Sequence, residues 1–284
     1  MPEFPITPVW INGQPNNRLP VNDRGLAYGD GVFETLRIVS GQPFLARLHW
    51  QRLQQSCERL AIPLDIELVI DEVSRFLQQC QAPNAILKLI VTRGSGGRGY
   101  NPEDCQNPTR CLSLHPLPQR KTNPAICGAR VTPCQLQLGR SALAGIKHLN
   151  RLEQVLARSE WQGANWDEGV VCDFDGYLIE GTMSNLFMVT RDGRLLTPDL
   201  SRCGVAGVCR AFILEQADSL GLITKTGFYP ATLLDSAEIT EVFLCNSVNA
   251  VWPVIEYAEQ LWPIGPVTIR IRDYLLKELK KLEE

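Results

Sequence analysis

The chain has 284 residues, enough for one large domain or two modest ones, and its 44% hydrophobic and 21% charged residues are typical of a soluble globular protein. Its 28 Lys and Arg residues against 31 Asp and Glu residues leave a net charge of −3, which offers no electrostatic footprint for nucleic acid or an anionic membrane. We therefore expect a small-molecule function.

Targeting and metal signals are not evident in the sequence. No apolar run approaches the roughly 20 residues that a membrane span needs, and Met1–Pro5 lacks the layout of a signal peptide, so the expected location is cytoplasmic. The ten cysteines are dispersed without a Cys-x-x-Cys pair, and His49, His115 and His148 lie far apart. We expect reduced, mostly buried thiols and no structural metal.

The first 115 residues predict a mixture of strands and helices. Strands are expected at 9–11, 32–39, 85–92 and 111–114. An Asn-Gly pair after the first strand predicts a tight hairpin turn. Helical spacing of apolar residues predicts one helix just after Arg47 and a second after Pro63.

Two glycine-rich segments interrupt this half of the chain. Residues 21–31 are rich in Gly and Asp, which suits a loop that lies close to a ligand as well as an ordinary surface loop. Residues 93–100 contain four glycines and two arginines, a composition that can bring guanidinium and backbone N–H groups onto an anion. The proline-rich stretch 116–124 is the predicted linker between a domain at 1–115 and a larger one at 125–284.

The second half places one lysine, Lys147, between a glycine-containing turn and an amphipathic helix. The expected buried face of that helix consists of Leu149, Leu152, Val155, Leu156 and the later Trp161. Strands are predicted at 126–133, 170–174, 177–189 and 241–245, with Asp-Gly turns between the middle ones.

Polar positions in the second half are candidate site residues. Glu180 stands inside an apolar strand, so its carboxylate should face solvent or be specifically paired. Gly204 and Gly207 precede a helix whose first N–H groups could receive a phosphate. Each of these residues, taken alone, also has an ordinary structural explanation.

Taken together and in order, these motifs resemble the class IV pyridoxal-phosphate family, which includes branched-chain and D-amino-acid aminotransferases and 4-amino-4-deoxychorismate lyases. The resemblance rests on Asp23-Arg24-Gly25, on residues 29–35, on Arg47 with the His49…Arg52 segment, on 147–152 and on 180–187. Three local features resemble the lyases in particular: residues 93–100, residues 143–156, and Thr35, where the aminotransferases tend to have glycine or an aliphatic residue.

The resemblance implies roles for named residues. Lys147 would carry the cofactor as a Schiff base and then act as a base, Glu180 would bind its pyridine nitrogen, and Thr35 would assist proton transfer. The implied phosphate ligands are Arg47, the backbone at Val208 and Cys209, and the step at Asn246-Ser247. The implied substrate contacts are Arg24, Arg93, Arg98, Tyr100 and His148.

The implied fold is α/β, with two domains of fold type IV, pyridoxal 5'-phosphate at their interface and homodimeric assembly. The implied reaction converts 4-amino-4-deoxychorismate to 4-aminobenzoate and pyruvate, in folate biosynthesis. Two alternatives stay open. A branched-chain or D-amino-acid aminotransferase would use the same lysine and cofactor, and a catalytically inactive pyridoxal-phosphate-binding protein would keep the fold alone.

Overall fold

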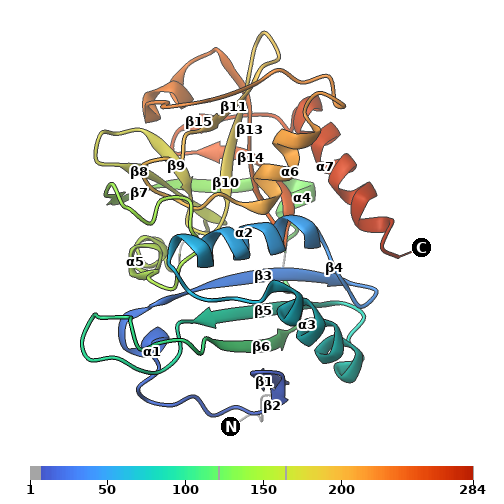
Figure 1. Ribbon diagram of the computed structural model, residues 1–284. Coiled ribbons are helices and arrows are strands. Elements are labelled where there is room, and N and C mark those ends of the chain that lie inside the picture. Colours follow the sequence, from blue (N-terminus) through green and yellow to red (C-terminus); the bar gives the residue numbers. More distant parts are fainter. Residues whose placement is uncertain (1–7, 121, 164, 284) are drawn as a thin grey trace. The chain divides into compact units, whose positions relative to one another are not determined.

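The computed structural model describes residues 8–120, 122–163 and 165–283, and they form two compact units (Figure 1). Unit 1 contains residues 8–119, 147–150 and 282–283, and unit 2 contains the other described residues. The domain limits expected from the sequence stay a prediction, and Met1–Pro5 lies outside the described residues. No helix of the described ranges is long and apolar enough to cross a membrane.

Unit 1 is built on a six-stranded antiparallel sheet. In the order β2-β1-β6-β5-β3-β4 the sheet joins β1 (Val9–Ile11), β2 (Gln14–Pro15), β3 (Gly31–Val39), β4 (Gln42–Pro43), β5 (Ala85–Thr92) and β6 (Thr109–His115). The predicted hairpin after β1 is confirmed, and Asn12 and Gly13 both have positive φ, as its tight turn requires. The long strand β3 lies between β5 and the two-residue β4.

Three helices complete unit 1: α1 (Arg24–Tyr28), α2 (Ala46–Arg59) and α3 (Ile66–Cys80). Asp65 caps α3 by accepting a hydrogen bond from the backbone N–H of Leu68. Val69, Val73 and Phe76 of that helix are buried, as the apolar spacing predicted. Arg47, predicted just before α2, lies inside it, because the helix already begins at Ala46.

Unit 2 contains a nine-stranded sheet. Its strands are β7 (Ala129–Leu138), β8 (Glu168–Asp173), β9 (Leu178–Gly181), β10 (Asn185–Thr190), β11 (Leu195–Pro198), β12 (Thr224–Gly227), β13 (Ile239–Asn246), β14 (Ala250–Tyr257) and β15 (Gln260–Leu261). Six strands follow one another as β10-β13-β14-β7-β8-β9, and a further pairing of β9 with β10 closes them into a ring. Strands β11 and β12 extend the sheet beyond β10.

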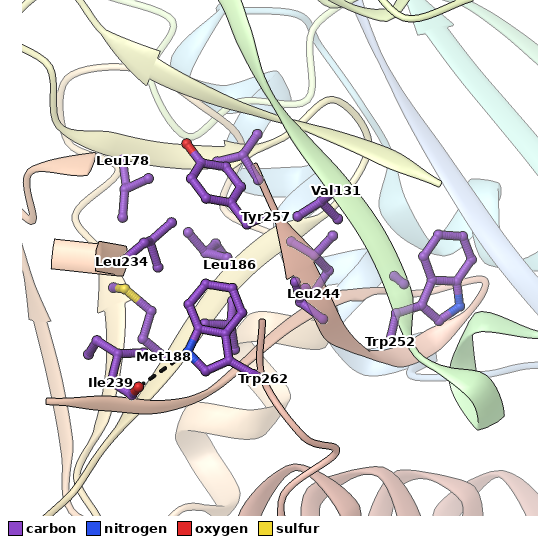
Figure 2. Close-up of a cluster of buried hydrophobic side chains, with 14 of the residues drawn as sticks. Val131, Leu178, Leu186, Met188, Leu234, Ile239, Leu244, Trp252, Tyr257 and Trp262 are labelled. Atoms are coloured by element: carbon purple, nitrogen blue, oxygen red, sulfur yellow. Dashed lines mark hydrogen bonds between the residues drawn. The ribbon is translucent and has the colours of Figure 1, made fainter. Parts of the chain in front are cut away.

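Buried apolar side chains of this ring form the largest described core of unit 2, part of which Figure 2 shows. Leu186, Met188 and Leu244 are fully buried there. The indole N–H of Trp262 donates to the carbonyl of Ile239. The indole is therefore buried with its polar nitrogen hydrogen-bonded.

The helices of unit 2 are α4 (Pro124–Cys127), α5 (Leu152–Ser159), α6 (Val208–Gln216), the 3₁₀ helix η1 (Ala231–Asp235) and α7 (Pro266–Lys280). The strand predicted at 126–133 is therefore partly wrong: a short helix capped by Asn123 comes first, and the strand runs on to Leu138. The long strand predicted at 177–189 is divided into β9 and β10 by a turn at 182–184.

The face of α5 that the sequence predicted to be buried is largely exposed in the single chain, although Trp161, just after the helix, is buried as predicted. Leu152, Val155 and Leu156 are 76%, 56% and 59% exposed. Amphipathic spacing identifies an apolar face, but it does not tell whether the same chain or another molecule covers it.

Candidate active site

In unit 1, the segment around Lys147 extends the sheet along β3. The N–H of Phe33 donates to the carbonyl of Lys147 at 2.9 Å, and the N–H of Leu149 donates to the carbonyl of Gly31 at 3.0 Å. Val32 and His148 form the antiparallel bridge between these bonds. The lysine main chain is thus fixed by the register of β3.

The side chain of Lys147 reaches one defined face of β3. Its Nζ atom lies 4.4 Å from the ring centroid of Phe33, at cation–π distance. Because side chains alternate along a strand, Thr35 points to the same face as Phe33. The structure therefore places Thr35 on the face of β3 that the Lys147 side chain reaches.

A second lysine on this face was missed by sequence reasoning. Lys88 is paired with Thr35 across β3 and β5, and its Nζ atom lies 5.4 Å from the Phe33 ring centroid. The only sequence signal was a charge inside the apolar strand 85–92, which is an ordinary feature of a half-buried strand. Two ammonium groups thus gather near the same aromatic ring.

The opposite face of β3 contains a buried ion-pair network. Glu34, 1% exposed, accepts hydrogen bonds from Arg52 and lies 2.6 Å from Nδ1 of the fully buried His49. Burial lowers the pKa of His49 and outweighs the opposing effect of Glu34, so the ring is neutral and its Nδ1–H donates to the carboxylate. Burial raises the pKa of Glu34, but Arg52 and His49 lower it more, to about 2. This network fastens α2 to β3.

Arg47, predicted to bind phosphate, has a different environment. Its side chain is exposed on α2, and Nη1 donates to Gln51 at 3.0 Å. Arg52, five residues further on, is only 12% exposed in its side chain and bound to Glu34. Phosphate binding by Arg47 stays a prediction. The exposure of its side chain in the single chain does not favour that role.

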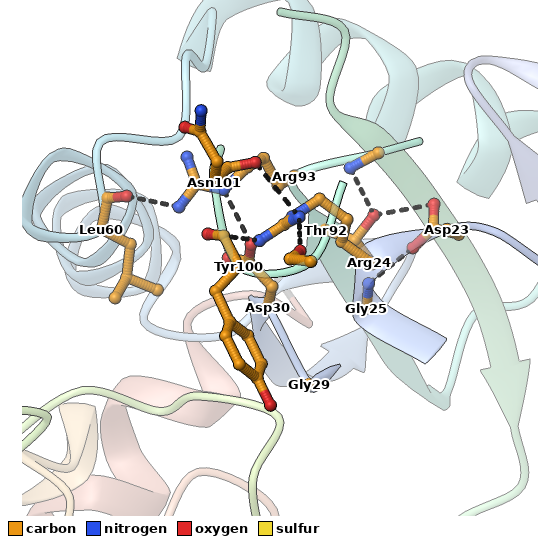
Figure 3. Close-up of polar contacts among 12 residues, drawn as sticks. Asp23, Arg24, Gly25, Gly29, Asp30, Leu60, Thr92, Arg93, Tyr100 and Asn101 are labelled. Carbon is orange, nitrogen blue, oxygen red and sulfur yellow. Dashed lines mark hydrogen bonds and ion pairs between the residues drawn. The ribbon is translucent and has the colours of Figure 1, made fainter. Parts of the chain in front are cut away.

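The predicted substrate arginines Arg24 and Arg93 are buried and occupied by internal acceptors (Figure 3). The Nε atoms of both donate to the same oxygen of Asp30, at 2.9 and 2.8 Å. Arg93 also donates to the carbonyls of Leu60 and Ala61. These bonds use the donors that a substrate carboxylate would need, so the geometry does not favour substrate contacts for this pair.

Two further predicted substrate contacts, Arg98 and Tyr100, lie on the loop 94–101. Arg98 is exposed, and Tyr100 is 84% exposed with its ring 5.3 Å from that of Tyr28. His148 is half-buried beside β3, as described above.

In unit 2, Glu180 is 5% exposed on β9 and specifically held. Its Oε2 atom accepts a hydrogen bond from the backbone N–H of Val205 at 2.8 Å and one from the amide of Asn185 at 3.4 Å. The sequence left open whether the Glu180 carboxylate faces solvent or is specifically paired, and the structure shows that it is paired. Asn185 also donates to the carbonyl of Val205, which fixes the loop before α6.

The start of α6 suits an anion. Gly207 is its N-cap and has no side chain to satisfy the first N–H groups, which include those of Val208 and Cys209. A Cβ atom at Gly207 would lie 1.9 Å from Oδ1 of Asn185, so only glycine fits here. The thiol of Cys209 is buried, so any ligand contact would be made by its backbone.

The step after β13 is shaped by Asn246. Its side-chain oxygen accepts hydrogen bonds from the backbone N–H groups of Val248 and Asn249, and its amide donates to the carbonyl of Met183. The side chain of Asn246 therefore builds the turn, and Ser247 lies within it.

A third buried carboxylate, Glu168, organises the turn between β9 and β10. It accepts hydrogen bonds from the hydroxyls of Thr182 and Ser184 and from the N–H groups of Gly169 and Met183. Burial raises the pKa of Glu168 and outweighs these hydrogen bonds. Sequence reasoning did not single out this residue, because the two hydroxyls that it binds lie 14 and 16 positions away.

Comparison with known proteins places these features in a family. An aminodeoxychorismate lyase from Vibrio harveyi is 36% identical over 94% of this chain and 98% of its own length. A putative branched-chain-amino-acid aminotransferase from Methanocaldococcus jannaschii is 32% identical over 93% of this chain and 94% of its own. The crystal structure of a 4-amino-4-deoxychorismate lyase from Pseudomonas aeruginosa is 44% identical, with a TM-score of 0.89 over 95% of this chain and 98% of that one. The family model of class IV amino-transferases matches residues 31–257, and the chain belongs to that family.

Proposed function

We propose that this chain is an aminodeoxychorismate lyase that depends on pyridoxal 5'-phosphate and works in the cytoplasm in folate biosynthesis. One observation carries the proposal: Thr35, the residue that resembles the lyases of the family, lies on the same face of β3 as the ring contacted by Lys147. The similar lyases from Vibrio harveyi and Pseudomonas aeruginosa support it. Ten free thiols suit a reducing compartment.

The donor groups of the chain fit this cofactor. Lys147 would supply the amine that attaches it, and the buried Glu180 would supply a carboxylate for its pyridine nitrogen. The N-terminus of α6 would supply backbone N–H groups for its phosphate, and the step at Asn246-Ser247 is the other phosphate position that the resemblance implies. Bound pyridoxal phosphate provides an electron sink for the carbon that bears the substrate amine.

The residues of the chain then act on protons. Lys147 Nζ would remove the proton from the carbon that bears the substrate amine. The C–O bond of the neighbouring enolpyruvyl ether breaks, the ring becomes aromatic, and the expelled enolpyruvate gains a proton to give pyruvate. The Thr35 hydroxyl, on the same strand face, assists this proton transfer. No amino acceptor is consumed.

The substrate has two carboxylates, which need cationic partners. Arg98 and Lys88 are the candidates we favour, because Arg98 is exposed on its loop and Lys88 faces the same ring as Lys147. Replacing Lys88 by Met should raise KM about tenfold, the effect of losing one charge-assisted contact. Steady-state kinetics of 4-aminobenzoate release measure this, and an unchanged KM would exclude Lys88 from the substrate site.

The exposed apolar face of α5 supports a homodimer. A helix that shows Leu152, Val155 and Leu156 to solvent is covered in most proteins by another molecule. Leu156→Glu should convert the dimer to monomers, whereas Leu261→Glu, at a 73% exposed position outside this face, should not. Light scattering of the two variants distinguishes them, and a Leu156→Glu variant that stays dimeric would remove α5 from the interface.

An aminotransferase is the second candidate, because the Methanocaldococcus jannaschii relative is described as one. The two functions differ in what they do to the cofactor. A transaminase converts bound cofactor to its pyridoxamine form when it meets an amino acid, which changes the visible absorption. Rapid conversion by alanine or leucine, without pyruvate release from 4-amino-4-deoxychorismate, would favour the aminotransferase.

A further inference from the structure

Arg24 connects the two ends of the glycine-rich loop 94–101. Its backbone N–H donates to the carbonyl of Gly94 at 2.9 Å, where the loop begins. Its guanidinium donates to three successive carbonyls where the loop ends: Gly99 at 2.9 Å, Tyr100 at 3.2 Å and Asn101 at 3.5 Å. One residue thus holds both ends of the loop.

Arg24 is itself firmly anchored. It is 4% exposed, and its Nε atom is bound to Asp30. The preceding residue, Asp23, is fully buried and accepts hydrogen bonds from Gly25, Thr92 and Thr109, which fixes the start of α1. The guanidinium also lies 5.0 Å from the Tyr28 ring centroid.

The start of the loop is also held by other contacts, because the N–H of Gly94 donates to the Thr92 hydroxyl and Ser95 forms a bridge with Asp23. Gly94, Gly96, Gly97 and Gly99 all have positive φ, so the unfolded chain has much backbone freedom to lose here. At Gly97 the backbone passes so close that a Cβ atom would lie 2.4 Å from the carbonyl of Asn101. The three bonds from Arg24 fix the carbonyls at the 99–101 end of the loop, and Arg98 lies immediately before them.

From these contacts we infer that Arg24 is a positioning residue for substrate specificity: it shapes the loop so that Arg98 is presented to an anionic group of the substrate. This inference rests on the proposed function for its substrate. In place of a direct substrate contact, the buried Arg24 holds the loop, and the exposed Arg98 binds the substrate.

Lysine cannot replace Arg24 in this role. The guanidinium directs five N–H donors in a fixed plane, and here they reach Asp30 and three carbonyls together. An ammonium group keeps the charge but has three donors on one atom. Arg24→Lys therefore keeps the positive charge beside Asp30 but removes hydrogen bonds that shape the loop.

Limited trypsin digestion of the cofactor-loaded protein tests the loop directly. The Arg98-Gly99 bond is an exposed trypsin cleavage site in the loop 94–101. Arg24→Lys should increase cleavage at this bond about tenfold. Two matched controls should leave it unchanged: Arg18→Lys on an exposed arginine, and Arg93→Lys, which leaves the three loop carbonyls bound. Equal cleavage of Arg24→Lys and wild type would overturn the inference.

A double-mutant cycle tests the connection to Arg98. Arg24→Lys and Arg98→Gln should each raise KM about tenfold with kcat nearly unchanged, and the double variant should be no worse than Arg98→Gln alone. Independent, multiplicative effects would overturn the inference even where the enzyme is active. If the wild type releases no 4-aminobenzoate, the proposed function fails and the substrate role of Arg24 fails with it, whereas the digestion result still reports the loop.

Discussion

The main chain around Lys147 is held by hydrogen bonds to β3. The bonds between residues 147–149 and β3 remain when the side chain is shortened. Lys147→Ala should therefore lower kcat by about 10³-fold or more, while the midpoint of thermal unfolding in the absence of cofactor changes little. Borohydride reduction should label Lys147 of the wild type and leave the variant unlabelled. Label on a different lysine of the wild type would contradict the assignment and favour an inactive binding protein.

Glu34 should make folding stability depend on pH. The folded-state pKa of about 2 lies below the ordinary value of 4.5, so the unfolded chain binds more protons between these pH values and stability falls as the solution is acidified through them. Glu34 should contribute about 3 kcal/mol at pH 6 that is lost by pH 2.

Urea unfolding of the wild type and Glu34→Gln at several pH values measures this contribution. The free energy of unfolding of the variant should be lower at pH 6 and depend less on pH below 4.5. Glu259→Gln, at an exposed position, is the control. Parallel pH curves for the wild type and Glu34→Gln would show that Arg52 and His49 do not stabilise the charge of Glu34.

At the scale of elements, the approach of the chain to α6 depends on Gly207. A methyl group there would push against Asn185, which orients Glu180. Gly207→Ala should weaken cofactor binding about tenfold, since both the first turn of α6 and the Glu180 carboxylate would move. Fluorescence titration with pyridoxal phosphate measures this. Gly139→Ala is the control, because its nearest neighbour is the exposed ring of Phe174 at 3.3 Å. Equal affinity of both variants would exclude the α6 approach as a phosphate site.

Sequence motifs predicted the turns whose conformation depends only on the residues within them. The Asn12-Gly13 hairpin and the Asp-Gly turns at 175–176 and 192–193 are observed because left-handed backbone at these positions depends on the residues themselves. The exposure of the apolar face of α5 was not predictable in the same way. The spacing of its apolar residues is a local property, but whether other residues cover them depends on the tertiary structure.

For the whole molecule, the candidate site residues were named by the order of the family motifs, and periodicity did not single them out. Motif order gave Lys147, Thr35 and Glu180 as candidates, and the structure shows how β3 and the Val205 backbone hold their segments. It did not predict that Arg24 and Arg93 bind Asp30 and backbone carbonyls, because donors and acceptors up to 77 residues apart meet only in the folded chain. Lys88 was missed for the same reason: its neighbours come from two other segments.

The proposed activity is tested most directly by incubating the cofactor-loaded protein with 4-amino-4-deoxychorismate and measuring both products. We predict equal amounts of 4-aminobenzoate and pyruvate, formed without any added amino acceptor and lost in Lys147→Ala. Conversion of the cofactor to its pyridoxamine form, with no 4-aminobenzoate released, would contradict the lyase and assign the chain to the aminotransferases of its family.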